Sequence, residues 1–405
     1  MSNTTTTNAK KKALLITTVS GFVPQFEMNN VRILQEMGYE VHYATNYNMP
    51  SYGNDNHRLD GTGIIRHQID FVRSPFDPSN IKIFRQLCQV MRDESFSLVH
   101  CHTPMGGVMA RLASHHTHTG PVIYTAHGFH FFKGAHLVNW LFYYPMERFL
   151  SRFTLQQLCI NQEDYHRAKR CFHARYVDYI PGDLNRIPEY SEEKNLQKRR
   201  ELGIPDNAIF LLSSGELIKR KNHETVLRAL AKLRQDGTLT SSVRYVICGH
   251  GKLDTYLKEL ANKLSITDIV LFAGYRKDIL DLCQACDLYV FPSYQEGLPM
   301  GLLEAMACSC PVLCSDIRGN QDLMGTPSRS EGNLEFCSGG IMIRKADDVD
   351  SFAKGLLTLI ATPQKLKEMG TRNASRCTNF SQPHVESIMR KIYSRAENRT
   401  RASAT

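Results

Sequence analysis

The feature that most constrains the fold is a repeated alternation of short apolar runs with amphipathic stretches of helical period. In the first half, apolar runs at 13–19, 41–45, 98–102 and 122–125 are predicted strands. Residues 27–37 form a predicted helix, with its apolar residues on one face and a glycine as its end. Strands that alternate with helices in this way predict βαβ units and a parallel, doubly wound sheet.

The same alternation returns in the second half of the chain. Predicted strands occur at 209–213, 245–248, 269–272, 288–291 and 311–314, and residues 222–233 have helical periodicity. We therefore predict an α/β protein with two doubly wound, Rossmann-like domains facing a central cleft. Ligands of such sheets bind beyond the carboxyl ends of the strands, so we expect the site in the loops that follow strands.

Shifts in composition predict the domain boundaries. A polar, charged stretch at 183–200 interrupts the alternation, and we expect the linker there. The predicted organisation, from the N-terminus, is a disordered leader, a first Rossmann-like domain, a linker, a second Rossmann-like domain, a helix that packs back on the first domain, and a disordered tail. Their predicted ranges are 1–12, 13–185, 186–200, 201–380, 381–397 and 398–405.

Composition excludes several classes of protein. No stretch approaches the ~20 apolar residues that span a bilayer, and the apolar run after Lys10–Lys12 is broken by Thr17 and Thr18, unlike a signal peptide. Net charge is +9, but the basic residues are scattered, so we expect no nucleic-acid partner. Twelve cysteines in a chain of 405 residues indicate a reducing compartment, and we interpret the groups at 283–286 and 308–314 as buried, inert thiols.

The sharpest motif is the segment from Glu296 to Glu304, which reads EGLPMGLLE. It follows a predicted strand, and a helix is expected to begin near Pro299. A helix start offers unpaired N–H groups to a phosphate, and two carboxylates beside it suit recognition of sugar hydroxyls. The plainer alternative is a helix cap and a solvated glutamate. The strand–loop–helix context favours a ligand site.

A second motif runs from Gly215 to His223 and contains three adjacent cations, Lys219, Arg220 and Lys221. Cations at the start of a helix are unfavourable unless an anion is present, so the motif suits a departing diphosphate.

Histidines after strands form a third pattern. Gly21 follows the first strand, His102 follows another, and His127 to His130 follow a third. Histidines near one cleft are compatible with zinc, but no carboxylate spacing completes a site, so we expect no metal. A lone buried histidine is more often a satisfied core residue.

Together these blocks resemble retaining glycosyltransferases of family 4, which have the GT-B fold, and especially the branch that makes capsules and exopolysaccharides. The resemblance covers residues 13 to 390. It implies that Glu296 contacts the donor sugar and Glu304 the ribose. It also implies that His127 contacts the donor near the reacting carbon. The catalytic residues implied by it are His127, Glu296 and Lys221, and the donor-binding set is Gly21, Gly215, Lys219, Arg220, Tyr275, Arg276, Gly297, Leu298, Pro299, Met300 and Glu304. It makes the first domain the acceptor domain and the second the nucleotide-sugar-binding domain.

Two positions depart from the family pattern. Glu216 replaces an arginine, which leaves open whether Lys219 or Arg220 makes the second phosphate contact. Ser309 replaces the glycine that usually ends the helix of Glu304. His102, Phe129 and His130 are expected to be structural or to lie on the acceptor side.

The resemblance implies transfer of a sugar from a UDP-linked donor, with retention, to a polyprenyl-diphosphate-linked surface glycan. Neither metal nor cofactor is expected, and the predicted location is the cytoplasmic face of the membrane. A nucleotide-sugar epimerase of the same fold and a non-catalytic partner of a transferase are the alternatives. Residues 129–155 predict binding to an anionic membrane or, equally, a core helix; their aromatic residues are Phe129, Phe131, Phe132, Trp140, Phe142, Tyr143, Tyr144, Phe149 and Phe153.

Overall fold

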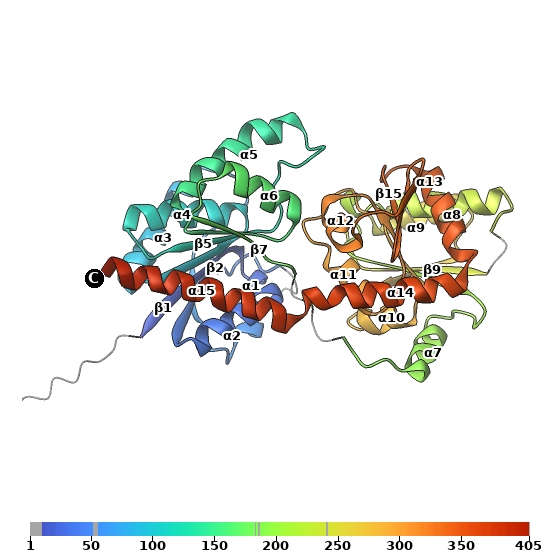
Figure 1. Ribbon diagram of the computed structural model, residues 1–405, viewed down its shortest axis with the longest axis horizontal. Helices are drawn as coiled ribbons and strands as arrows, with labels where there is room; N and C mark the ends of the chain where they lie inside the picture. The colour runs from blue at the N-terminus through green and yellow to red at the C-terminus, as the bar shows by residue number, and fades with distance from the viewer. Residues whose placement is uncertain (1–9, 52–55, 183, 185–186, 240–241, 405) are drawn as a thin grey trace, which may run out of the picture. The chain divides into compact units, whose positions relative to one another are not determined.

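The computed structural model describes residues 10–51, 56–182, 184, 187–239 and 242–404 (Figure 1). The chain forms two compact units. The N-terminal unit contains the chain up to Pro181 together with the segment from Pro383, and the C-terminal unit is Gly182–Gln382. The two units are described separately below.

A seven-stranded parallel sheet, in the order β3-β2-β1-β4-β5-β6-β7, forms the centre of the N-terminal unit. The order reverses between β1 and β4, which is the switch point of a doubly wound sheet. All four predicted strands are confirmed. The strands are β1 Lys11–Val19, β2 Tyr39–Asn46, β3 Ile65–Gln68, β4 Leu98–His102, β5 Val122–Ala126, β6 Gln156–Cys159 and β7 Tyr176–Tyr179.

The C-terminal unit has an eight-stranded sheet in the order β10-β9-β8-β11-β12-β15-β14-β13. Its first six strands are parallel, and β13, β14 and β15 pair antiparallel, an addition that the sequence did not predict. The strands are β8 Ile209–Ser214, β9 Val243–Cys248, β10 Val270–Gly274, β11 Leu288–Phe291, β12 Val312–Ser315, β13 Arg329–Glu331, β14 Leu334–Cys337 and β15 Gly340–Ile343.

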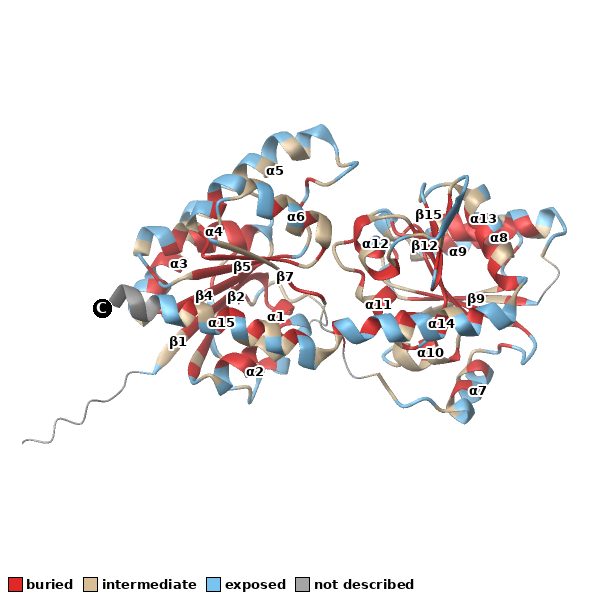
Figure 2. Ribbon diagram, viewed as in Figure 1, coloured by how far each residue is buried: buried red, intermediate tan, exposed pale blue. Residues whose placement is uncertain are grey.

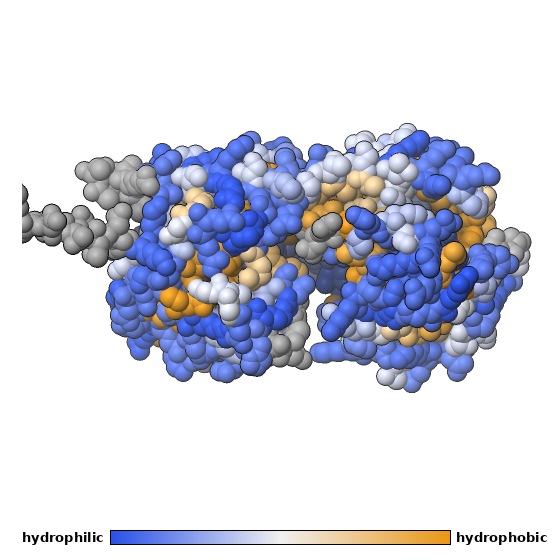
Figure 3. Space-filling model, turned by 90° about the horizontal axis from the view of Figure 1, so that it is seen from below, coloured by the Kyte–Doolittle hydropathy of each residue, from blue (hydrophilic) through white to orange (hydrophobic). Residues whose placement is uncertain are grey.

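Helices cover both faces of each sheet, and their apolar residues build the cores (Figure 2). On the face drawn in Figure 3, hydrophilic side chains cover most of the surface. The helices of the N-terminal unit are α1 Phe22–Phe26, α2 Met28–Glu36, α3 Asn80–Glu94, α4 Pro104–Thr117, α5 Leu137–Leu150, α6 Gln162–Cys171 and α15 Gln382–Ala404. Those of the C-terminal unit are α7 Glu192–Glu201, α8 His223–Gln235, α9 Asp254–Lys263, α10 Ile279–Ala285, α11 Met300–Ala307, α12 Arg318–Met324, α13 Val349–Ile360 and α14 Pro363–Cys377. Short 3-10 turns occur at η1 Asn56–Leu59, η2 Ser151–Phe153, η3 Lys219–Lys221 and η4 Thr378–Phe380.

Helix α15 belongs to the core of the N-terminal unit although it ends the chain (Figure 1). Met389, Ile392 and Tyr393 are buried in the same cluster as Leu15 and Val41. The Tyr393 hydroxyl also lies 2.9 Å from His100 Nδ1. The helix continues to Ala404, so the expectation of disorder from residue 398 was wrong for the described residues.

Two other expected segments differ from the structure. The stretch 186–200, expected as a linker, contains most of α7, which packs against α10 in the C-terminal unit. Ser191 caps α7 by accepting a hydrogen bond from the backbone N–H of Lys194 (3.3 Å), and Lys194 pairs with Asp281 of α10. The expected leader 1–12 lies partly outside the described residues, and β1 already begins at Lys11.

All twelve cysteines are free, and ten of them are buried. The two groups singled out in the sequence meet in the structure, where Cys286 Sγ lies 3.3 Å from Cys310 Sγ. Burial raises the pKa of the Cys286 thiol, so it stays protonated, as expected for an inert thiol.

Candidate functional site

In the C-terminal unit the three cations lie between β8 and α8. Gly215 follows β8 with a φ of +146°, a backbone conformation that residues with a side chain rarely adopt. A Cβ at this position would lie 3.2 Å from Lys221 Cε. Lys219, Arg220 and Lys221 form the 3-10 turn η3, and α8 begins after Asn222 rather than at it. The glycine therefore lets the Lys221 side chain lie flat across the end of the strand.

Lys221 and Arg220 both contact the Glu296 carboxylate. Lys221 Nζ donates to Glu296 Oε1 (2.8 Å), and Arg220 Nη1 lies 2.7 Å from the same oxygen. The exposed fraction of Glu296 is only 9%, and that of the Lys221 side chain is 15%. The two motifs, 75 positions apart, thus form one cluster of two cations and a carboxylate. Lys219 is exposed beside it, without a described contact to Glu296.

Helix α12 packs against the loop that carries Glu296. Arg318 Nε donates to the Glu296 backbone carbonyl (3.2 Å), and a Cβ on Gly319 would lie 2.6 Å from the Gly297 carbonyl oxygen. This close packing fixes residues 296–299 where β11 turns into α11. Arg318 is buried, and the sequence motifs predicted no role for it.

Helix α11 begins at Met300 with Pro299 as its N-cap, as the sequence predicted. Its first turn presents the backbone N–H groups near Leu298 to Met300, a favourable place for a phosphate. Glu304 lies one turn further along. Burial raises the pKa of its carboxyl to about 7, so Glu304 changes charge near neutral pH.

Tyr275 and Arg276 follow β10, and their roles differ. Tyr275 is 68% exposed, and its backbone N–H donates to His250 Nε2 (3.2 Å). The Arg276 guanidinium contacts Asp278 (2.8 Å) and also bonds Glu201 of α7. Its side chain is therefore committed to joining α7 to the domain, which leaves the backbone of the loop to meet a ligand.

In the N-terminal unit, Gly21 follows β1 and precedes α1. A Cβ there would lie 1.5 Å from the carbonyl oxygen of Ser51, so close packing of two loops already requires the glycine. Gly21 therefore has a packing role besides the donor-side role predicted from the sequence.

His102 and His127 lie together, and the structure adds a carboxylate. His102 Nδ1 lies 3.2 Å from His127 Nε2 and 3.3 Å from Glu27 Oε1. Glu27 lies at the distant start of α2, so no spacing near the histidines could predict it. Burial lowers the pKa of His102 well below its ordinary value, so its imidazole is neutral. These three groups could hold a metal ion, as could His42, His67 and Glu94.

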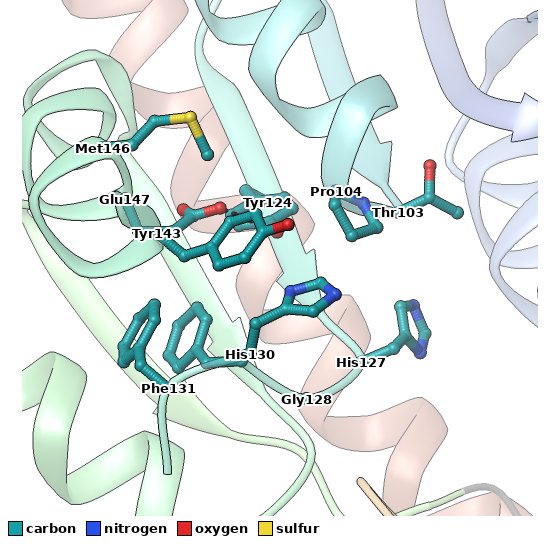
Figure 4. Close-up of a pocket in the computed structure, with 11 residues that line it drawn as sticks. Thr103, Pro104, Tyr124, His127, Gly128, His130, Phe131, Tyr143, Met146 and Glu147 are labelled. Carbon is teal, nitrogen blue, oxygen red and sulfur yellow. Dashed lines mark hydrogen bonds between the residues drawn. The ribbon is translucent and has the colours of Figure 1, made fainter. Parts of the chain in front are cut away.

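His127 also borders a pocket of about 240 Å³ between α4, the loop after β5, and α5 (Figure 4). Phe129 and His130 line the pocket together with His127, whereas His102 does not line it. Its lining residues are Thr103, Pro104, Tyr124, His127, Gly128, Phe129, His130, Phe131, Tyr143, Met146 and Glu147.

Much of α5 is exposed, as the pale blue of its ribbon in Figure 2 shows, and its exposed side carries apolar side chains. Leu137, Val138 and Leu141 are 72–79% exposed. Trp140 and Tyr144 of the same helix pack against the core. The prediction of a core helix therefore holds for one side of α5, and membrane binding stays a prediction. Among the described residues, no helix is long and apolar enough to cross a membrane.

Known proteins match both halves of the chain. A model of group 1 glycosyl transferases matches residues 194–376, and a glycosyl transferase 4-like model matches residues 12–161. EpsD of Bacillus subtilis, a provisionally assigned glycosyltransferase, is 33% identical over 390 residues, which cover 95% of this chain and 96% of EpsD. The chain belongs to the glycosyltransferases.

Other relatives agree with this membership. The glycosyltransferase is 28% identical over 321 residues to the UDP-Gal:α-D-GlcNAc-diphosphoundecaprenol α-1,3-galactosyltransferase of Escherichia coli, covering 75% of this chain and 78% of that enzyme. HepE of Anabaena, solved with UDP-glucose, superposes with a TM-score of 0.72 at 17% identity, over 95% of this chain and 99% of HepE. WaaG, a glycosyltransferase involved in lipopolysaccharide biosynthesis, gives 0.67 at 15% identity, over 94% and 99%. These structures confirm the predicted GT-B fold.

Proposed function

We propose that this glycosyltransferase moves a sugar, a hexose or an N-acetylhexosamine, from a UDP-linked donor, with retention of configuration, to a polyprenyl-diphosphate-linked glycan destined for a capsule or exopolysaccharide. The observation that carries the proposal is the cluster of Lys221, Arg220 and Glu296 beside the first turn of α11. It supplies positive charge, helix N–H groups and a carboxylate within one loop region. HepE, solved with UDP-glucose, and the E. coli galactosyltransferase, named for a lipid-linked substrate, support the choice of donor and acceptor.

Each group has a separate task in the proposed reaction. Lys221, with Lys219 or Arg220, neutralises the diphosphate, and the N–H groups at 298–300 bind its distal phosphate. Glu296 accepts hydrogen bonds from the donor sugar, and Glu304 accepts them from the ribose. Lys221 Nζ donates to Glu296 Oε1, and its ammonium carries two further N–H groups with which to bind the phosphates.

The bond changes follow from these tasks. The bond between the sugar's anomeric carbon and the diphosphate oxygen breaks, while the acceptor hydroxyl forms a new bond on the same face. The departing diphosphate takes the proton of that hydroxyl, so the reaction needs no separate base. Lysine and arginine stabilise the charge that grows on the leaving group, so we propose that neither a metal nor a cofactor takes part. His127 contacts the donor near the reacting carbon.

Removing Glu296 or Lys221 tests the proposal. E296A and K221A should lose transfer by at least a hundredfold, because each removes a group that acts on developing charge. Lys258→Ala, at an exposed lysine of α9, is the matched control. Turnover of either variant near the wild-type kcat/KM would show that the cluster serves another purpose.

Two alternatives predict different products. An epimerase of the same fold would release a changed or free sugar from the donor alone, whereas a transferase needs the acceptor. A non-catalytic partner would show no turnover and would tolerate loss of both glutamates. Incubating each UDP-sugar with and without a lipid-linked acceptor, with product analysis by mass spectrometry, separates all three.

We further propose that the N-terminal unit binds the cytoplasmic face of an anionic membrane through α5. Its exposed face combines Leu137, Val138, Leu141 and Phe149 with the cation Arg148, as interfacial helices do. Co-sedimentation with liposomes should show binding that grows with anionic lipid and falls with salt. Leu141→Asp should weaken this binding. Ile81→Asp, at an exposed position of α3, is the control. Equal binding to neutral and anionic vesicles would contradict this proposal.

A further inference from the structure

A buried ion pair that the proposed reaction does not use lies next to the pocket beside His127, and its carboxylate lines that pocket. Arg111 of α4 is fully buried, and its Nη1 lies 2.8 Å from Glu147 Oε2. Arg111 Nε also donates to the Gly107 carbonyl (2.8 Å), and its guanidinium lies 4.0 Å from the centre of the Tyr124 ring. Burying two charges carries a large desolvation cost, so stabilisation of the fold does not by itself explain such a pair.

The pair orients Glu147 towards the pocket. Arg111 holds Oε2, whereas the described contact of Oε1 is a long one to the Tyr124 hydroxyl, at 3.4 Å. Glu147 is 5% exposed, and it lines the pocket although Arg111 does not. A carboxylate oxygen accepts more than one hydrogen bond. Oε1 therefore retains capacity to accept hydrogen bonds from a ligand in the pocket.

Aromatic rings form much of the remaining wall. Tyr143 is half-buried and stacks on His130, with ring centres 4.6 Å apart, and Phe131 lies beside them (Figure 4). In Figure 4, Glu147, Tyr124 and Tyr143 gather on one side, and His127 lies at the other end beside Thr103. Apolar ring surfaces around one buried carboxylate suit a pyranose, which presents C–H groups on its faces and hydroxyls around its edge.

The size and place of the pocket narrow its ligand. About 240 Å³ is below the ~300–1,000 Å³ of pockets for drug-sized molecules, so one sugar ring fits better than a disaccharide or a nucleotide. The pocket borders His127, and α5, which supplies Tyr143 and Glu147, has the exposed apolar side described above. A sugar carried on a lipid would thus meet the pocket and the apolar surface on one helix.

We propose that this pocket binds the terminal sugar ring of the acceptor, with Glu147 Oε1 accepting hydrogen bonds from its hydroxyls and the Tyr143 ring packing against its C–H groups. The assignment of this sugar to the acceptor rests on the proposed function. Arg111 is a positioning residue, because it acts through Glu147. Thr103 and His130 complete the polar rim of the pocket.

The test measures acceptor binding without donor, so that it does not depend on turnover. The probes are N-acetylglucosamine, N-acetylgalactosamine, glucose and galactose, each linked through diphosphate to a farnesyl chain, and saturation-transfer NMR reports contact with the intact protein. Y143A and E147Q should weaken binding of the preferred probe about ten- to a hundredfold, as loss of a packed ring or a charged hydrogen-bond partner does. Ile81→Ala, at an exposed position of α3 outside the pocket lining, should leave it unchanged.

Kinetics provide the second readout. Y143A should raise the acceptor KM by a similar factor and leave the donor KM within twofold. Because E147Q disturbs a buried ion pair, Y143A, at a half-buried ring, keeps the test decisive if E147Q folds poorly. Binding of all probes by Y143A at wild-type strength, no binding of any probe by the wild type, or a raised donor KM would each overturn the proposal. Loss of probe binding in Y143A supports it even if the wild type transfers no sugar, and that last result would count against the proposed function alone.

Discussion

Replacing Glu304 with glutamine should stabilise the C-terminal unit and impair its function. Burial raises the pKa of this carboxyl to about 7 from its ordinary value of 4.5. The folded unit therefore binds the proton more tightly than the unfolded chain does, and its free energy of unfolding falls as pH rises from about 4.5 to about 7. Above that range the free energy of unfolding is lower by roughly 3 kcal/mol at most, because each tenfold difference in proton affinity between the folded and unfolded states is worth about 1.36 kcal/mol.

Glutamine has no charge to bury, so E304Q should not show this loss. Urea unfolding should give similar stabilities for the two proteins at pH 4.5, and a variant more stable by up to ~3 kcal/mol at pH 8. Glu216→Gln, at an exposed glutamate of the same unit, is the control. A difference in stability between E304Q and the wild type that is the same at pH 4.5 and at pH 8 would refute the reasoning.

The same substitution should weaken donor binding. An ionised carboxylate is the better acceptor for ribose hydroxyls, and losing such a hydrogen bond costs about 1.5–3 kcal/mol, or ten- to a hundredfold in the donor Kd. Calorimetry with UDP-sugar should also show wild-type affinity rising between pH 6 and pH 8, as Glu304 ionises. Unchanged affinity in E304Q would separate the buried carboxylate from the nucleotide site.

Two further predictions concern the metal and the end of α11. Transfer should continue in excess EDTA, because lysine and arginine neutralise the leaving group; loss of turnover that magnesium or manganese restores would contradict the mechanism, and restoration by zinc alone would direct attention to Glu27, His102 and His127. Ser309→Gly should raise the free energy of unfolding by up to ~1 kcal/mol, since Ser309 has φ +62°, and thermal unfolding that shifts downward would contradict this.

The sequence predicted the fold wherever strands are continuous apolar runs. It missed β6, in which Gln156 and Gln157 are buried although they are polar, and the exposed edge strand β3. It also missed α7, which has no apolar stripe and is held by ion pairs such as Lys194–Asp281. In these elements tertiary contacts, which no local pattern reveals, decide the structure.

The site divides in the same way. Glu296, Lys221 and the start of α11 are recognisable because each belongs to a local motif that follows a strand, and the structure brings the first two into contact. Glu27 and Glu147 lie in helical stretches with no signal of their own, and they reach the histidines and the pocket only through folding. A single carboxylate on a helix gives no sequence signal that separates it from a solvated one.

Helix α15 has a consequence for how the protein is made. The core of the N-terminal unit is completed by residues after 382, so the ribosome must first synthesise the whole of Gly182–Gln382. At ~5–20 residues per second this takes roughly 10 to 40 s. Throughout that interval Leu15, Val41 and their neighbours lack the helix that covers them. The first half of the chain therefore exposes part of its apolar core during translation, and a gene cut after residue 181 encodes an incomplete domain.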